Sequence, residues 1–294
     1  GLSVATLADH PAYKTTVWPS PFPRAWSEFS ERSFRAYLDF ENELEWTAHA
    51  LLAQAEAINA FLPMKTEFDT AILIGDFATA KDILDAIESR FGISVWLAEA
   101  RISYLQLTAG FKAQTDFVRQ VTTKANSALA RFIISWIALK FEENTSYAQL
   151  IRMVERFASK EFGLYYLLRL LLGDFTRLST KMAGQTLSHA DTLPVIDRYI
   201  AFLRVVQAVL ASSADDAATR ASLRRSLSPL ANRIDDLKLR RAYFSSGGEI
   251  DFQEFRPSLR EALDAYTRGD NADAEEKCCE EGSEFPASIA PIDL

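Results

Sequence analysis

The chain contains only two cysteines and three histidines among its 294 residues. The cysteines, Cys278 and Cys279, are adjacent, and a bridge between neighbours is strained because bonded cysteines normally hold their Cα atoms about 5.5 Å apart. The sequence therefore carries no disulfide framework, which is typical of a protein in the reducing cytoplasm. With so few thiols and imidazoles, we expect neither a metal centre nor a bound cofactor.

The chain also lacks a long hydrophobic run. Its most apolar stretch, residues 162–172, is interrupted by Arg169 and is shorter than the roughly 20 residues that span a bilayer. No charged-then-apolar signal segment opens the sequence, although Gly1 in place of Met is compatible with a trimmed start. We expect a soluble, cytoplasmic protein with no membrane partner.

Glycine and proline are scarce, at eleven and ten residues, and alternating runs of β-branched residues are few. Hydrophobic residues make up 48% of the chain and charged residues 24%, which is ordinary globular usage. Because Ala, Leu, Glu, Arg and Phe are plentiful, the composition favours helices. The predicted fold class is all-α.

Prolines gather near the start of the chain, within residues 1–25, where they alternate with aromatic residues. Such a density of proline forbids a helix. The pattern predicts an extended Pro/aromatic arm that lies on the first helices. The prolines are Pro11, Pro19, Pro21 and Pro23.

Residues 26–294 are predicted to form a helical-repeat domain. From about Ser27 to Leu62, apolar residues recur three or four positions apart, which is typical of one face of a helix. We expect this helix to break near Asn42 and to end at Pro63, because proline cannot continue the helical hydrogen bonding.

The string Ile74-Gly75-Asp76-Phe77 is the most informative local signal. Glycine fits the left-handed conformation that closes a helix, and aspartate fits the cap that opens the next helix. Apolar residues at helical spacing follow. The string predicts two antiparallel helices joined by a tight turn.

Similar turn signals recur along the chain. Gly110 interrupts a helical pattern, and Gly173 and Gly269 are each followed by an aspartate. We expect these glycines to lie between consecutive antiparallel helices, with Asp174 and Asp270 capping the helices that follow.

The spacing of the turns suggests a repeat. From Gly75 to Gly110 to Asn144 the intervals are 35 and 34 residues, close to the period of about 34 residues in tetratricopeptide repeats, which have two helices per unit. A small residue stands five places after the turn glycine at Ala80 and at Ala274. These two units resemble the second half of a tetratricopeptide repeat.

Other units match the family less well. Five places after Gly110 and Gly173, where the family has a small residue, this chain has Thr115 and Leu178. Pro286, in contrast, stands where the closing proline of the family would follow the last helix. The resemblance, that of a divergent tetratricopeptide-like repeat, implies stacked antiparallel hairpins, an α-solenoid, that binds other proteins or peptides. A non-repetitive helical bundle is the alternative.

The residues after Pro286 are apolar enough to begin another element. We therefore expect the helical domain to be truncated at its C-terminus, as in the N-terminal part of a larger protein.

No catalytic motif is present: the sequence has no phosphate loop, zinc-protease pair, calcium loop or nucleophile elbow. Glu45 precedes His49 by four positions on one helix face, a spacing that suits an ion pair, a metal site or a proton shuttle. The further carboxylates of a di-iron site are missing, so we favour the ion pair. His189 falls in a predicted loop before Pro194. No catalytic residue is predicted.

Aromatic residues make up 12% of the chain. Many recur at helical spacing and are predicted to be core residues, with a few lining a peptide-binding groove. The most regular series is Trp96, Tyr104, Phe111, Phe117, Phe132 and Trp136.

Charge is segregated near the C-terminus. Residues 220–241 hold seven basic and two acidic side chains, whereas residues 249–294 hold thirteen acidic and four basic ones. One interpretation is that the two segments pack together and neutralise each other, through acids such as Glu261, Asp264 and Glu275. The other is a basic patch that binds a phosphate or an acidic partner. The candidate binding residues are Arg220, Arg224, Arg225, Arg240 and Arg241.

The leading functional hypothesis is a protein–protein interaction scaffold or regulatory module that binds another protein or a peptide. The first alternative is nucleic-acid or phosphate-ligand binding through residues 220–241, which is less favoured because the net charge is −8. The second alternative is an enzyme with an unrecognised active site.

Overall fold

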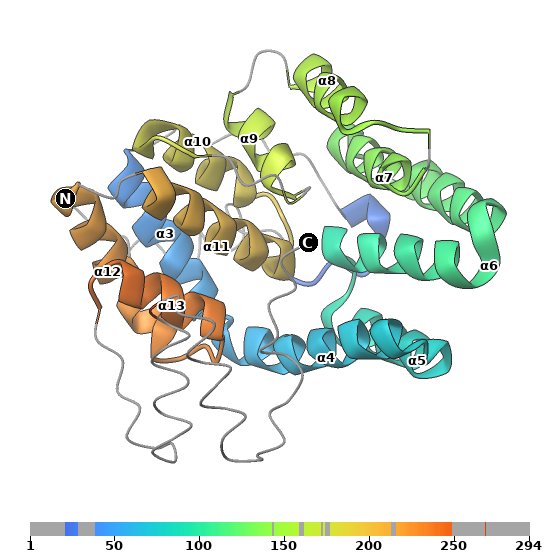
Figure 1. Ribbon diagram of the computed structural model, residues 1–294, viewed down its shortest axis with the longest axis horizontal. Coiled ribbons are helices and arrows are strands. Elements are labelled where there is room, and N and C mark those ends of the chain that lie inside the picture. Colours follow the sequence, from blue (N-terminus) through green and yellow to red (C-terminus); the bar gives the residue numbers. More distant parts are fainter. Residues whose placement is uncertain are drawn as a thin grey trace.

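The computed structural model describes residues 21–28, 39–142, 144–158, 162–171, 173, 177–212, 216–248 and 268. All regular structure within these residues is helical, which confirms the all-α prediction (Figure 1). The elements are η1 (Trp26–Glu28), α3 (Phe40–Leu52), α4 (Ala55–Ile74), α5 (Phe77–Phe91), α6 (Val95–Lys124), α7 (Ala128–Lys140), α8 (Tyr147–Phe157), α9 (Phe162–Leu171), α10 (Thr180–Ala190), α11 (Val195–Ser212), α12 (Ala217–Ala231) and α13 (Leu237–Ser245).

The predicted turn between α4 and α5 is confirmed. Helix α4 ends at Ile74, and Gly75 adopts the left-handed conformation with φ of 77°. The carboxylate of Asp76 accepts the backbone N–H of Thr79 at 3.1 Å and caps α5. The small residue Ala80 is fully buried, which allows the two helices to approach closely.

Two further glycine turns were predicted within the described residues. Gly110 has non-helical backbone angles, φ 77° and ψ −178°, and joins two helical halves of α6 at a kink, where the ribbon changes direction (Figure 1). Gly173, with φ of 83°, lies in the connection between α9 and α10. Asp174, Gly269 and Asp270 lie outside the described residues.

The prediction that Pro63 ends a helix is wrong. Pro63 lies inside α4, and the chain turns earlier, at residues 53–54. Proline removes one backbone hydrogen bond, but buried Ile58 and Phe61 before it and buried Phe68 after it hold both halves of α4 in the core. Tertiary packing outweighs the local preference.

Helix α3 begins close to Asn42, where a break in a longer helix was predicted. The carboxylate of Asp39 accepts the backbone N–H of Asn42 at 2.9 Å and caps the helix, which begins at Phe40. Residues 29–38, which precede this start, lie outside the described residues, so the predicted break itself stays a prediction.

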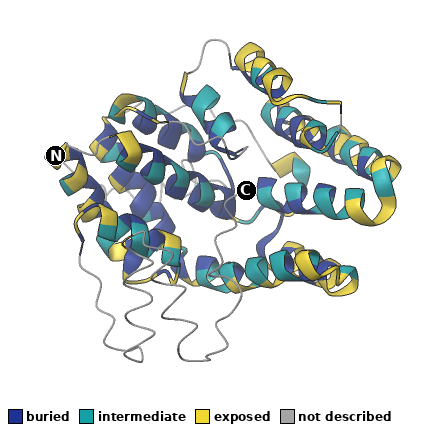
Figure 2. Ribbon diagram, in the orientation of Figure 1, coloured by how far each residue is buried: buried dark blue, intermediate teal, exposed yellow. Residues whose placement is uncertain are grey.

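The core is organised around α11. This helix touches α3, α4, α6, α9, α10 and α13, and Figure 2 shows it as largely buried. Helix α3 also packs on α10 and α12, which follow it in the chain by more than a hundred residues. Contacts between helices distant in sequence therefore supplement the contacts between neighbours. The buried residues of α11 are Val195, Ile196, Asp197, Arg198, Tyr199, Ala201, Phe202, Leu203, Val205, Val206, Ala208 and Val209.

The backbone of residues 21–28 forms hydrogen bonds both to a residue just after the end of α5 and to the start of α11. The backbone oxygen of Pro23 accepts the N–H of Ile93 at 2.7 Å, and that of Pro21 accepts the N–H of Val195 at 3.2 Å. Gly92 makes this approach possible, because a Cβ there would lie 2.3 Å from the Pro23 oxygen. The rest of the predicted arm, residues 1–20, lies outside the described residues.

Candidate binding surfaces

The five predicted arginines lie on two neighbouring helices. Arg220, Arg224 and Arg225 are exposed on α12, and Arg240 and Arg241 are half-buried on α13. The opposite face of α12 is buried and packs on α3. The arginines of α12 are therefore turned to solvent because the apolar positions of the same helix face the core.

The arginines differ in how they are paired. Arg240 forms an ion pair with Asp235 at 3.0 Å, and Arg224 donates to the backbone oxygen of Gly247 at 3.4 Å. Among the described residues, no carboxylate lies within 4 Å of the guanidinium groups of Arg220 or Arg225. The acids that were predicted to neutralise them lie outside the described residues.

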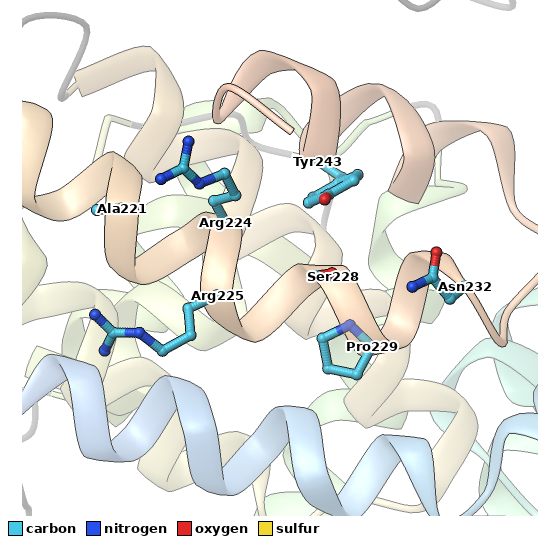
Figure 3. Close-up of a pocket in the computed structure, with 7 residues that line it drawn as sticks. All are labelled: Ala221, Arg224, Arg225, Ser228, Pro229, Asn232 and Tyr243. Carbon is cyan, nitrogen blue, oxygen red and sulfur yellow. The ribbon is translucent and has the colours of Figure 1, made fainter. Parts of the chain in front are cut away.

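An open depression of about 600 Å³ lies beside these arginines. Figure 3 shows the guanidinium groups of Arg224 and Arg225 at one end of it, and Tyr243 and Asn232 at the other. The lining residues are Ala221, Arg224, Arg225, Ser228, Pro229, Asn232 and Tyr243.

The side chain of Asn59 on α4 holds the turn between α12 and α13 through two hydrogen bonds. Its side chain donates to the backbone oxygen of Arg233 and accepts the backbone N–H of Asp235, both at 2.8 Å. The Tyr199 hydroxyl donates to Asp236, the cap of α13, at 2.5 Å. Burial raises the pKa of Tyr199 well above its usual value, so this hydroxyl remains a donor and the α12–α13 hairpin rests on a fixed support.

A second surface is apolar and lies at the end of α4 and at the kink of α6. We call it the tip surface, and it comprises Leu73, Ile74, Leu107 and Phe111, which are 70%, 73%, 55% and 55% exposed. Phe111, one of a series of aromatic residues predicted to lie mostly in the core, is exposed and directly follows the kink at Gly110. The predicted core residue Trp136, in contrast, is fully buried.

The two parts of the tip surface are linked through α5, which packs on both α4 and α6. The rings of Phe77, at the start of α5, and Tyr104 of α6 meet edge to face with centroids 6.5 Å apart. Arg101 of α6 bridges Asp85 and Glu88 of α5 at 2.7 and 2.6 Å. Both ends point to the same edge of the molecule in Figure 1 and are coloured as exposed in Figure 2. The helix ends that carry the tip surface are thus connected through α5.

The residues examined for catalysis are dispersed. Glu45 and His49 on α3 form no ion pair within 4 Å, so the predicted pairing is wrong: Glu45 faces solvent while His49 is half-buried. His189 lies in the last turn of α10 rather than in a loop, and burial lowers its pKa to about 4. Among the described residues, no three side chains of the ligand types gather as a metal site. Cys278 and Cys279 lie outside the described part of the chain.

Sequence reasoning missed one strongly perturbed group. Asp197 on α11 is fully buried, and its carboxylate accepts the backbone N–H of Val95 at 2.7 Å and of Trp96 at 2.9 Å. Burial raises its pKa to about 7, against the effect of these two hydrogen bonds. The sequence signal that could have identified Asp197 is an acidic residue among the apolar residues of α11. Asp197 serves to join two helices and does not line the depression beside the arginines.

Comparisons with known protein families, with curated proteins and with solved structures found no match to the chain. The likeness to tetratricopeptide repeats therefore rests on the sequence signals alone. Of the helices described, none has the length and hydropathy needed to cross a membrane.

Proposed function

We propose that this chain is a helical scaffold or regulatory module that binds another protein through its tip surface, and that its hairpins are divergent tetratricopeptide-like units working in the cytoplasm. The exposure of Leu73, Ile74, Leu107 and Phe111 at one edge supports the proposal. Large exposed apolar side chains that gather at one edge of a protein are typical of interaction sites.

The shape and size of the tip surface define the partner. Four partly exposed side chains present much less area than the roughly 800 Å² that each partner contributes to a standard interface. That area is small for a permanent dimer of this chain. Because the ends of helices protrude, the matching surface is an apolar cleft on a different protein, and the complex is a transient one.

Site-specific photo-crosslinking tests the proposal. A photoreactive phenylalanine analogue is placed at Ile74 or Phe111 and, as a control, at exposed Lys181 on α10. We expect one discrete heterologous adduct from both tip positions and none from the control after irradiation in the native cells. Equal adducts from all three positions, or an adduct with the mass of two copies of this chain, would refute the proposal.

A further inference from the structure

We infer that the outer face of α12 is a separate binding site for a carboxylate-rich peptide segment of a partner protein. The site is the depression beside Arg224 and Arg225, described above, and is independent of the tip surface. Four observations carry the inference: the arrangement of the lining residues, the unpaired charge, a backbone acceptor that lacks its usual helical donor, and the fixed support of the α12–α13 hairpin.

The lining residues form one continuous stripe. On α12 they stand three or four positions apart, from Ala221 to Asn232, so they share one side of the helix. With Arg220 included, the stripe is about 18 Å long at 1.5 Å per residue, the span of five or so extended residues at about 3.3 Å each. Ser228 and Pro229 lie on α12 between Arg225 and Asn232 (Figure 3). A narrow extended chain fits such a stripe.

The described part of the protein does not neutralise the positive charge of the stripe. The nearby acid Glu41 on α3 accepts a hydrogen bond from Ser222 at 2.7 Å, a residue of the buried face of α12. Arg220 and Arg225 have no described carboxylate within 4 Å. Guanidinium groups bind carboxylates through two parallel hydrogen bonds, so a peptide with several acidic side chains is the complementary ligand.

A backbone acceptor favours a peptide over a nucleic acid. Pro229 lies inside α12 and has no N–H, so the backbone oxygen of Arg225 lacks its usual helical donor. Helical carbonyl groups point toward the residue four positions on, and here that residue lines the depression. A peptide supplies a backbone N–H for this oxygen, whereas a phosphodiester chain has no such donor. Nucleic acid is also disfavoured by the net charge of −8 and by the single aromatic ring in the lining.

The test uses the full chain and three labelled probes: deca-glutamate, deca-glutamine and a ten-nucleotide oligothymidylate. Fluorescence anisotropy gives their affinities at low and moderate salt. We expect deca-glutamate to bind, deca-glutamine not to bind, and the triple variant Arg220→Ala, Arg224→Ala, Arg225→Ala to bind deca-glutamate about tenfold or more weakly. Circular dichroism establishes that each variant retains its fold.

The matched control carries the same change in net charge elsewhere. It replaces Arg131, Arg152 and Arg156, which are exposed on α7 and α8, and we expect its affinity to stay within about twofold of the original chain. Pro229→Ala gives the Arg225 oxygen its helical donor and should weaken deca-glutamate binding with no change of charge. Equal losses in the two triple variants, or no binding at all, would overturn the inference. Tighter binding of oligothymidylate would assign the site to nucleic acid instead.

The acidic residues 249–294 of the chain itself are a competing ligand by charge. A variant with Glu275, Glu276, Glu280 and Glu281 each changed to Gln tests this competition. If deca-glutamate binds only to that variant, the occupant is the chain's own segment and the inference of a partner peptide fails. We expect binding to both forms.

Discussion

The carboxylate of Asp197 on α11 accepts the backbone N–H of Val95, the first residue of α6, across a separation of 102 residues. A second bond, from the N–H of Trp96, completes the cap. The first N–H groups of a helix have no partner within the helix, and here the central helix of the core satisfies two of them. The start of α6, and with it the base of the tip surface, is tied to α11.

Asp197→Asn should flatten the dependence of stability on pH. Burial raises the folded-state pKa of Asp197 from 3.8 to about 7, with nearby Glu99 raising it and Arg204 lowering it. The stabilising contribution of Asp197 to the free energy of unfolding is therefore complete below about pH 4 and is lost as the pH rises through 7. We expect the decrease in melting temperature between pH 5 and 8 to be smaller in Asp197→Asn than in the original chain or in the exposed control Asp82→Asn. Parallel curves for all three would contradict the buried, titrating carboxylate.

Gly163→Ala should destabilise the chain by about 2–3 kcal/mol through overpacking. A Cβ at Gly163 of α9 would lie 2.6 Å from the backbone oxygen of Gln185 and 2.6 Å from a ring carbon of His189, both on α10. The backbone oxygen cannot rotate away as a flexible side chain can. Gly75→Ala is the control, because its Cβ would meet nothing within 4 Å and only the left-handed backbone is strained, at about 1 kcal/mol. Urea denaturation measures both, and an equal cost would show that α9 and α10 are not in close contact.

Asp76→Ala should cost about 1 kcal/mol, because the cap of α5 loses its acceptor. The hydrogen bonds to Thr79 lower the pKa of Asp76, so the charged form is the one that caps. Asp82→Ala, on an exposed face of the same helix, should change the free energy of unfolding by less than about 0.5 kcal/mol. If the two substitutions cost the same in urea denaturation, Asp76 is not acting as a cap.

Features that depend on a few adjacent residues were predicted correctly, whereas features that depend on packing between distant segments were not. Gly75 and Asp76 were placed correctly because backbone conformation and capping depend on a few adjacent residues. Pro63 was misplaced because side chains on both sides of it are buried by other helices, which outweighs the local cost. Phe111 lies outside the core although its spacing is helical, because helical spacing alone does not tell which face of a helix other elements cover.

The candidate surfaces show the same division. The sequence identified the arginines of α12, since charge is visible in composition. Which of them face solvent depends on the packing of α12 against α3, a helix about 170 positions earlier. The role of Asp197 depends on α6 meeting α11, and no pattern within either segment contains that information.

The affinity of the crosslinked partner for tip variants tests the central claim most directly. The double variant Ile74→Ser, Phe111→Ser is compared with Tyr147→Ser, Phe162→Ser, which removes two side chains of similar exposure on α8 and α9. Each large apolar side chain buried in an interface contributes about 1.5–3 kcal/mol, so isothermal titration calorimetry should show the tip variant binding about a hundredfold or more weakly. The control variant should bind as the original chain does. An unchanged dissociation constant for the tip variant would contradict the account.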